Sequence, residues 1–411
     1  SLLAIGDTPL AGHFKGCDAV INLVGILNEA GSQTFRGVHV ELAKRVAAAC
    51  VEAGVPRLLH MSALNADAVG LMEIQNNGST AAQNLVDALN AQVGAGTYAV
   101  VPDPAAGTGT DAIKVGMIYR PAKVTPVGTY KILDSTVDPR FIDTKNRPTL
   151  AQTFQDNATG ARFTVVVNHL KSKGSDCNDV GDPDLADGQG NCSQTRKAAA
   201  QALVDWLATD PTGSGDPDFL IMGDLNSYAQ EDSVDAIRAG ADDIAGTGDD
   251  FTNLIAQYQG QYAYSYTFDG QAGYLDHALA SASILSQVAG AEDWHINSDE
   301  PDVLDYDTSF KPAQQDALYE PNAYRTSDHD PVVVGINPIN FPPEVGSIAV
   351  SANVIALGAG AVNANVGFTD PDKLDTHAAT WNWGDGSSSA GAVTEGGGTG
   401  TVSGSHTYAA P

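Results

Sequence analysis

Four short segments in the middle of the chain carry residues that together could hydrolyse a phosphate ester. Each places histidine, aspartate or asparagine at the end of a short apolar run, where a buried strand presents polar side chains to a cleft. The segments are Asn-His-Leu-Lys (168–171), Gly-Asp-Leu-Asn-Ser-Tyr (223–228), Tyr-Leu-Asp-His-Ala-Leu (274–279) and Ser-Asp-His-Asp-Pro (327–331). Histidines, carboxylates and an amide are the groups that hold a divalent metal on a phosphodiester and move protons around it.

The spacing within these segments indicates which side chains act together. Asp224 and Asn226 are two residues apart at a strand end, so their side chains point to the same side and can address one phosphate. His277 follows Asp276 directly and should point to the opposite face, which favours a structural role. A lone histidine such as His169 is more often a core residue, so the evidence for a catalytic role comes from the other motifs.

Strands that alternate with helices must position these segments. Apolar runs predict strands at 67–74, 114–119, 162–168, 219–222, 274–278 and 331–335, and helices at 80–90 and 195–209. Ser79 is the expected N-cap of the first helix. This order predicts an α/β (α+β) two-sheet sandwich with its cleft at the strand ends.

The charge balance excludes proteins that coat nucleic acid through a broad basic surface. The chain has 21 basic and 50 acidic residues, a net charge of −29. The first 66 residues are neutral, so the excess belongs to the remainder. Such acidity is compatible with a nuclease whose metal bridges carboxylates to phosphate, and equally with plain solubility. No apolar run is long enough to span a bilayer.

Cys177 and Cys192 flank a loop rich in aspartate and glycine. Little apolar content is available to order this loop, so a disulfide is the expected staple, and it implies an oxidising compartment. The carboxylates of residues 176–191 offer a Ca²⁺ site as an alternative to plain turns. Cys17 and Cys50 lie in apolar surroundings and are expected to be buried thiols.

The ordered motifs over residues 66–337 resemble the endonuclease/exonuclease/phosphatase superfamily, and most closely secreted bacterial nucleases of the ExeM/NucH type. The resemblance implies a DNase I-like sandwich and Mg²⁺- or Mn²⁺-dependent hydrolysis of DNA. Glu73 matches the strand-end glutamate that is the principal metal ligand, and Asp328 matches a second carboxylate on the metal side. Because Mg²⁺ keeps several waters, one or two protein ligands suffice.

The same resemblance assigns the remaining site residues. His169 would contact the scissile phosphate, with Asp224 binding metal or orienting water and Asn226 donating a hydrogen bond. Asp276 would hold the imidazole of His329, the general base or proton shuttle.

Three further residues, Tyr119, Arg120 and Arg147, match positions that touch substrate phosphates. For each arginine alone, a surface ion pair is nearly as good an interpretation. Asp111 is a candidate to orient His169.

The N-terminal segment departs from this pattern. Residues 1–65 contain expected strands at 18–25 and 57–61 around a helix at 38–53. They resemble a fragment of an NAD-dependent epimerase or atypical short-chain dehydrogenase. The segment lacks Gly-x-Gly-x-x-Gly, and no Tyr-x-x-x-Lys follows Ser62, so NAD binding is not expected. It occupies the place of the nuclease family's first strand, which predicts a recombined chain unless Asn22 or Asn28 replaces the lost ligand.

After a linker at 338–343, residues 344–411 are rich in Ala, Gly and Val. Phe-Thr-Asp-Pro-Asp (368–372), Trp-Asn-Trp-Gly-Asp-Gly (381–386) and Ser-His-Thr-Tyr (405–408) resemble a PKD-type, immunoglobulin-like module. The resemblance implies a small β-sandwich that contacts other proteins or polysaccharide.

The sequence thus predicts a secreted, metal-dependent deoxyribonuclease, although no signal peptide is visible in the chain. One alternative is another phosphodiesterase or phosphatase of the same fold. A second is a catalytically incomplete chimeric chain that binds only metal or surfaces. Endo- or exonucleolytic mode and the preference between DNA and RNA are left open.

Overall fold

The computed structural model describes most of the chain from Ala66 onward and a few residues before it. The described residues are 15, 20–22, 49, 53, 58–60, 66–104, 107–304, 311–318, 325–352, 360–373 and 375–408. They divide into two compact units. One comprises Ser1–Ala66 with Glu300–Ser327, and the other Asp67–Asp299 with Asp328–Pro411.

In the first unit, β1 (Val20–Asn22) pairs in parallel with β2 (Leu58–His60). These two strands lie within the ranges predicted at 18–25 and 57–61. Among the described residues they form a separate two-stranded sheet, so no described strand of this segment joins the larger sheets. Most of the helix expected at 38–53 lies outside the described residues.

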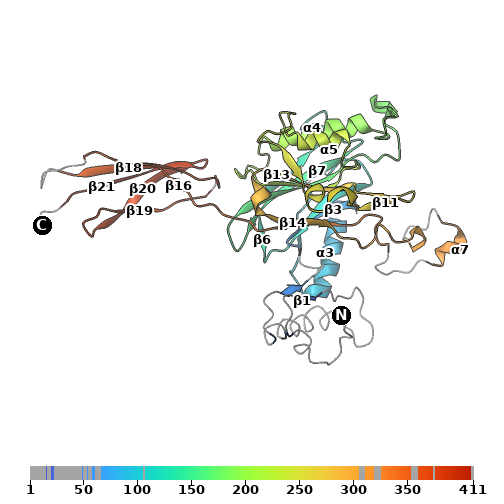
Figure 1. Ribbon diagram of the computed structural model, residues 1–411, viewed down its shortest axis with the longest axis horizontal. Helices are drawn as coiled ribbons and strands as arrows, with labels where there is room; N and C mark the ends of the chain where they lie inside the picture. The colour runs from blue at the N-terminus through green and yellow to red at the C-terminus, as the bar shows by residue number, and fades with distance from the viewer. Residues whose placement is uncertain are drawn as a thin grey trace. The chain divides into compact units, whose positions relative to one another are not determined.

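The second unit is built on a six-stranded sheet with the order β10-β13-β9-β8-β7-β6, seen in Figure 1 below α4 (Ser193–Leu207) and α5 (Asp232–Arg238). Its strands are β6 (Val124–Leu133), β7 (Arg147–Asp156), β8 (Arg162–His169), β9 (Phe219–Asp224), β10 (Phe251–Asn253) and β13 (Asp276–Ser281). Only β8 and β9 pair in parallel; the other neighbours are antiparallel.

This sheet is covered on both faces. Val166 packs with α4 and α5 in one apolar cluster, while its neighbours Val165 and Val167 belong to a second cluster on the opposite face. Because side chains alternate along a strand, burial on both faces explains the uninterrupted Val-Val-Val run of β8.

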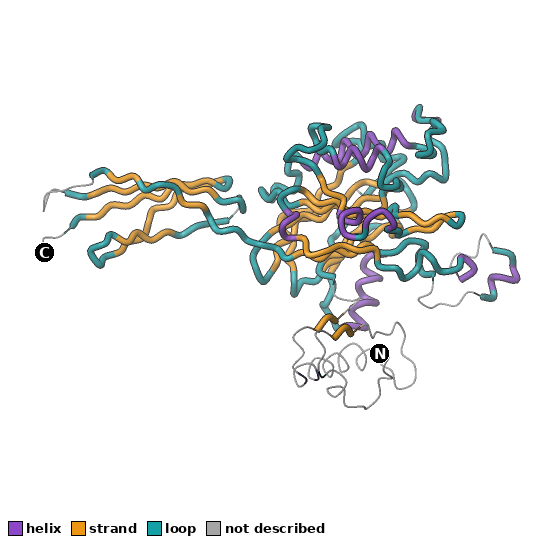
Figure 2. Tube along the Cα trace, in the orientation of Figure 1, coloured by secondary structure: helices purple, strands orange, loops and turns teal. Residues whose placement is uncertain are grey.

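A smaller sheet, β3-β5-β4, packs on that opposite face, with a pair of strands, β14 and β15. Its strands are β3 (Ala68–Gln75), β4 (Ala99–Val100) and β5 (Ile113–Tyr119), and the pair consists of β14 (Val288–Asp293) and β15 (Val332–Ile336). A Cβ on Gly70 would lie 2.8 Å from Val167, so glycine permits the close approach of β3 to β8. The layers, with helices and strands coloured apart in Figure 2, form the α/β two-sheet sandwich that the sequence predicts.

The first helix of this unit, α3 (Thr80–Val93), covers the smaller sheet through Val86. Ser79 stands at its N-cap but makes no side-chain cap bond. The predicted N-cap position is confirmed, but the Ser79 hydroxyl accepts the Asp103 N–H at 3.0 Å rather than an N–H of the helix.

The C-terminal residues form an antiparallel ladder with the order β16-β18-β21-β20-β19, and β17 pairs with β18. The strands are β16 (Glu344–Val345), β17 (Ala349–Val350), β18 (Val362–Thr369), β19 (Ala379–Asn382), β20 (Ser388–Gly396) and β21 (Thr399–His406). Trp381 and Trp383 stack in a small core of their own with ring centroids 5.6 Å apart. The immunoglobulin-like assignment stays a prediction. Among the described helices, none has the length and apolar character needed to cross a bilayer.

The disulfide between Cys177 and Cys192 is present, and both residues are buried. Within the loop, Asp176, Asp184 and Asp187 each accept a backbone N–H two residues further on. No three acidic, histidine or cysteine side chains among the described residues form a metal-binding group. The loop carboxylates therefore serve turns, and the calcium site stays a prediction.

Replacing Cys177 and Cys192 together with alanine should lower the free energy of unfolding by about 3 kcal/mol, because the crosslink no longer restricts the unfolded chain. Urea denaturation with and without reductant measures this. Reductant should destabilise the wild type and leave the double variant unchanged; equal sensitivity of the two would contradict the structural role.

His277 is fully buried beneath the sheet edge. Its Nε2 lies 2.7 Å from the Ser227 carbonyl oxygen, which makes Nε2 the donor, and its Nδ1 faces the Asn253 amide. Burial lowers the pKa of His277 to about 4. The imidazole is therefore neutral and structural, as its position next to Asp276 suggests.

Below its ordinary pKa His277 binds a proton in the unfolded chain but not in the folded one. Stability present above pH 6.5 is therefore lost as pH falls toward 4, by on the order of 3 kcal/mol. His277→Gln should be less stable than wild type at pH 7, and the difference should shrink toward pH 4.5 in urea titrations. A difference that does not change with pH would contradict this prediction.

Candidate active site

Strand pairing brings four polar residues into one row. Arg147 on β7 faces His169 on β8, His169 faces Asp224 on β9, and Asp224 faces Asp276 on β13. These strands are neighbours in the six-stranded sheet. We call these four residues the row. Three of them come from the sequence motifs, and Arg147 comes from β7, a strand that sequence reasoning did not predict.

The chain approaches the row through a glycine that cannot be replaced without strain. Gly223 has φ of 122°, and a Cβ there would lie 2.1 Å from the Asn168 carbonyl oxygen of β8. Only glycine combines this backbone conformation with such a close approach. The Gly-Asp pair of the motif therefore reflects how β9 is seated against β8.

Asn226 holds Asp224. Its backbone N–H donates to Asp224 Oδ1 at 2.7 Å, and its Nδ2 donates to Asp224 Oδ2 at 2.9 Å and to the Leu170 carbonyl oxygen at 3.0 Å. Both N–H groups of the amide are thus engaged. Asn226 is therefore a positioning residue in this structure, and the donation to phosphate expected from the sequence would require one of these bonds to break.

Asp224 and His169 are both buried and close. His169 Nε2 lies 3.4 Å from Asp224 Oδ2 and 3.5 Å from Arg147 Nη1. Burial, followed by the Asp276 carboxylate, raises the pKa of Asp224 to about 7. Burial, followed by Arg147, lowers the pKa of His169 to about 3, so this imidazole is neutral. Asp111 pairs with Arg147 Nε at 2.9 Å rather than with His169, which corrects the orienting role proposed for it.

His329 and Asp276 form the expected pair. His329 Nδ1 lies 2.6 Å from Asp276 Oδ2, and the Ser265 hydroxyl donates to the same oxygen at 2.7 Å. Burial alone would lower the pKa of His329, but Asp276, then Asp224 and Asp328, outweigh it and raise the pKa to about 10. Charge from surrounding carboxylates therefore controls the protonation of His329.

Asp330, which sequence reasoning missed, fixes the segment that carries His329. Its buried carboxylate accepts the backbone N–H groups of Ile296, Asn297 and Ser298, and the Ser298 hydroxyl at 2.6 Å. His295 Nδ1 lies 3.0 Å from Asp330 Oδ2, the oxygen that also accepts the Ser298 hydroxyl. The only signal in the sequence was a second aspartate in Ser-Asp-His-Asp-Pro, which does not distinguish a structural carboxylate from a catalytic one.

Glu73 and Asp328 are the carboxylates that the sequence predicts as metal ligands. Glu73 lies in a β-bulge of β3 with φ of 56° and is exposed. Within the described part of the chain its carboxylate makes no hydrogen bond or ion pair, yet its charge raises the pKa of Asp224. An exposed carboxylate that has no protein partner among the described residues, and whose charge acts on Asp224, suits a hard cation that keeps most of its waters. No three acidic, histidine or cysteine side chains of the described residues form a metal-binding group, so Glu73 and Asp328 stay predicted ligands of a divalent metal.

The structure does not bring Tyr119 and Arg120 to the row. The Tyr119 ring packs on Phe154 with centroids 5.6 Å apart, and Phe154 faces Phe163 near the start of β8, at the opposite end from the row. Arg120 Nη1 lies 3.6 Å from Asp67 Oδ1. Both residues therefore lie about a strand's length from the site, whereas Arg147 lies within it.

A local group of cations flanks the row despite the net charge of −29. Lys171 donates to the Ser175 hydroxyl at 2.7 Å. Burial and then the positive charges of Arg147, Lys145 and Arg196 lower the pKa of Lys171. The net charge of the whole chain gives no indication of these positive side chains near the end of β8.

Arg196 of α4 is completely buried and ties three loops together. Its guanidinium donates to the carbonyl oxygens of Lys171, Gln189 and Asn191 and to the Ser227 hydroxyl. The planar, five-donor guanidinium satisfies these acceptors at once. The segments that follow β8 and β9 are therefore held to the disulfide loop by one side chain.

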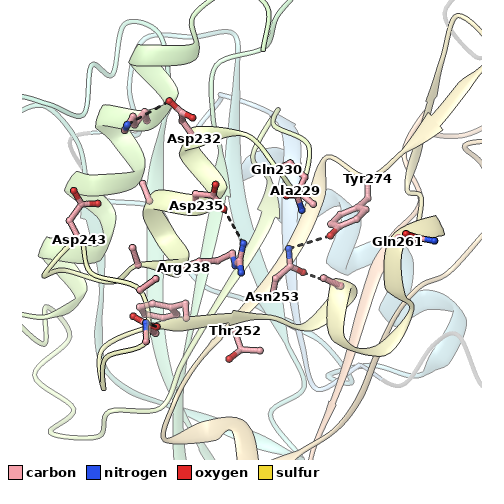
Figure 3. A pocket seen from close by; sticks show the side chains of 18 of the residues that line it. Ala229, Gln230, Asp232, Asp235, Arg238, Asp243, Thr252, Asn253, Gln261 and Tyr274 are labelled. Carbon is pink, nitrogen blue, oxygen red and sulfur yellow. Dashed lines mark hydrogen bonds and ion pairs between the residues drawn. The ribbon is translucent and has the colours of Figure 1, made fainter. Parts of the chain in front are cut away.

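A separate hollow of about 1210 Å³ lies beside α5 and β10. Figure 3 shows the Asp235–Arg238 ion pair in it, and the Asn253 amide reaching the Tyr274 hydroxyl. Its lining includes none of the row's four residues. The concave region is thus distinct from the row.

Comparison with known proteins identifies the family. A family model described as Endonuclease/Exonuclease/phosphatase family matches residues 45–329, beginning before the domain boundary expected at residue 66. No curated protein matches the chain.

Several solved structures are similar to the chain at low identity and with low TM-scores. A Bacteroides thetaiotaomicron mannosyl-6-phosphatase is 15% identical over 78% of this chain and 98% of its own, with a TM-score of 0.40. The human Nocturnin catalytic domain is 15% identical over 60% and 76%, with a TM-score of 0.37. D. rerio TDP2 complexed with a single-strand DNA product is 14% identical over 62% and 80%, with a TM-score of 0.34.

The family match spans most of the chain and contains the row, Glu73 and His329. The predicted superfamily is thereby confirmed, while its ExeM/NucH-type specificity stays a prediction. The chain belongs to the endonuclease/exonuclease/phosphatase family, whose members are metal-dependent hydrolytic phosphoesterases.

Proposed function

We propose that this protein is an extracellular, metal-dependent nuclease that hydrolyses phosphodiester bonds of DNA. The observation that carries the proposal is the row, with His329 bound to Asp276 at one end and Lys171 near Arg147 at the other. Groups that activate water and groups that bind phosphate are thus adjacent. The buried disulfide supports an oxidising, extracellular location.

His329 is the group proposed to take the proton from the attacking water. Asp276 holds Nδ1 at 2.6 Å, which leaves Nε2 as the nitrogen that exchanges the proton. The Ser265 hydroxyl donates to the same carboxylate oxygen, which keeps the carboxylate oriented toward the imidazole. A divalent cation at Glu73 and Asp328 would polarise the phosphoryl oxygen and offset the carboxylate charge that keeps His329 protonated.

The other end of the row is proposed to receive the phosphate. Neutral His169 and cationic Arg147 lie 3.5 Å apart and supply hydrogen-bond donors for the charge that develops on the phosphoryl and leaving oxygens. Asp224, held by two hydrogen bonds from Asn226, keeps the imidazole of His169 in place. Water attack and departure of the leaving oxygen then occur on opposite sides of the phosphorus.

His169→Ala and His329→Ala should each lower the rate of plasmid DNA hydrolysis with Mg²⁺ or Mn²⁺ by about 10²- to 10⁴-fold, because each removes a positioned proton donor or acceptor. His377→Ala, a matched histidine change in the C-terminal ladder, should cleave like wild type. Activity that survives both site substitutions would rule out the assignment.

Glu73→Gln should remove most of the thermal stabilisation by Mg²⁺, because a ligand that binds only the folded state raises its unfolding temperature. Scanning calorimetry across a Mg²⁺ titration measures this without reference to activity. Glu292→Gln, at an exposed position of β14, is the matched control and should respond like wild type. Equal Mg²⁺ stabilisation of wild type and Glu73→Gln would place the metal elsewhere.

A further inference from the structure

A short aromatic hairpin lies next to the proposed site. Strands β11 (Tyr266–Phe268) and β12 (Gln271–Gly273) pair antiparallel across Asp269 and Gly270, whose φ values are 50° and 76°. Two positive φ values in a two-residue loop are the geometry of the tightest hairpin turns. The hairpin is therefore set by its sequence, and its side chains alternate between two faces.

One face of this hairpin carries aromatic rings at alternate positions. Tyr266 and Phe268 share that face, with ring centroids 6.3 Å apart and an interplanar angle of 11°. Phe268 is 65% exposed, and Tyr262, in the short 3-10 helix before the hairpin, is 86% exposed. A nearly parallel pair of rings that leaves a phenylalanine in solvent marks a surface adapted to bind something flat and apolar.

The aromatic face is continuous with the site. Tyr266 forms an isolated β-bridge with His329, and their rings lie 4.6 Å apart. The residue before it, Ser265, donates to Asp276. The neighbouring residues Ser265 and Tyr266 thus contact Asp276 and His329, respectively. Lys171 and Arg147 lie at the other end of the row. Cations flank one side of the phosphate position, and aromatic rings flank the other.

We propose that Tyr266 and Phe268 form a stacking platform for a nucleobase next to the scissile phosphate. The inference rests on the proposed nuclease function and narrows its substrate. A base offers a π-face on either side, which a sugar phosphate or a lipid headgroup lacks. In a duplex those faces are covered by neighbouring bases, so the platform is suited to single-stranded or frayed DNA.

The test compares two fluorescein-labelled single strands of equal length and charge, hexathymidylate and its abasic analogue. Binding is measured by anisotropy with Mg²⁺ in a His169→Ala background, and gels verify that the strands stay intact. The thymine-bearing strand should bind more tightly, and Phe268→Ala should reduce that preference by about 5- to 100-fold. Phe268→Trp should retain it. Ile244→Ala, at a similarly exposed apolar residue outside the hairpin, is the control.

Equal affinity for the two strands, including failure to bind either, would overturn the platform. So would a preference that Phe268→Ala leaves unchanged while its unfolding temperature matches that of the parent. Failure of the nuclease proposal has a different signature: wild-type protein that leaves DNA intact with Mg²⁺ and Mn²⁺, whatever the ratio of affinities.

Discussion

The parallel pairing of β8 with β9 is the constraint on which the rest of the site depends. It is the only parallel contact in an otherwise antiparallel six-stranded sheet, and it places the exits of both strands at the same edge. His169 and Asp224 become neighbours for this reason, and their other partners follow from the antiparallel ladders on either side. Gly223 permits the approach because no side chain has to fit against Asn168. Backbone pairing thus determines which side chains meet at this edge.

The electrostatics of that edge are those of several carboxylates held close together. Asp224 and Asp276 face each other across adjacent strands, and both are buried. The free energy of bringing them together is offset by His329 on one side and by the hydrogen bonds of Asn226 on the other. Glu73 adds further negative charge from the second sheet. An arrangement that raises the pKa of one group and holds a neighbouring histidine protonated is typical of sites that operate with a bound cation.

Much of this could be predicted from the sequence, for identifiable reasons. Strands such as β8 and β9 end in polar motifs after fully apolar runs, so both their position and the grouping of His169, Asp224, Asp276 and His329 were predictable. Strand β7 was missed because Arg-Pro-Thr-Leu-Ala-Gln-Thr does not alternate clearly, although Arg147 itself was selected. Tyr119 and Arg120 were misplaced because a motif shows which strand carries a residue, not which end of the sheet that strand end reaches. Asn226 holds an aspartate only two residues away, but its anchor to the Leu170 carbonyl is long-range. The role of Asp330 depends entirely on partners more than 30 residues away, which no local pattern encodes.

The buried guanidinium of Arg196 has a consequence for how the protein matures. It donates to Lys171, in the segment after β8, and to Ser227, in the segment after β9. It also donates to Gln189 and Asn191 of the disulfide loop. A chain whose cysteines are still reduced lacks the crosslink that restrains this loop, while Arg196 can still use Lys171, Ser227 and the Glu231 carboxylate 3.5 Å away. We therefore expect the thiol–disulfide state of the loop to influence how well the segments after β8 and β9 are ordered.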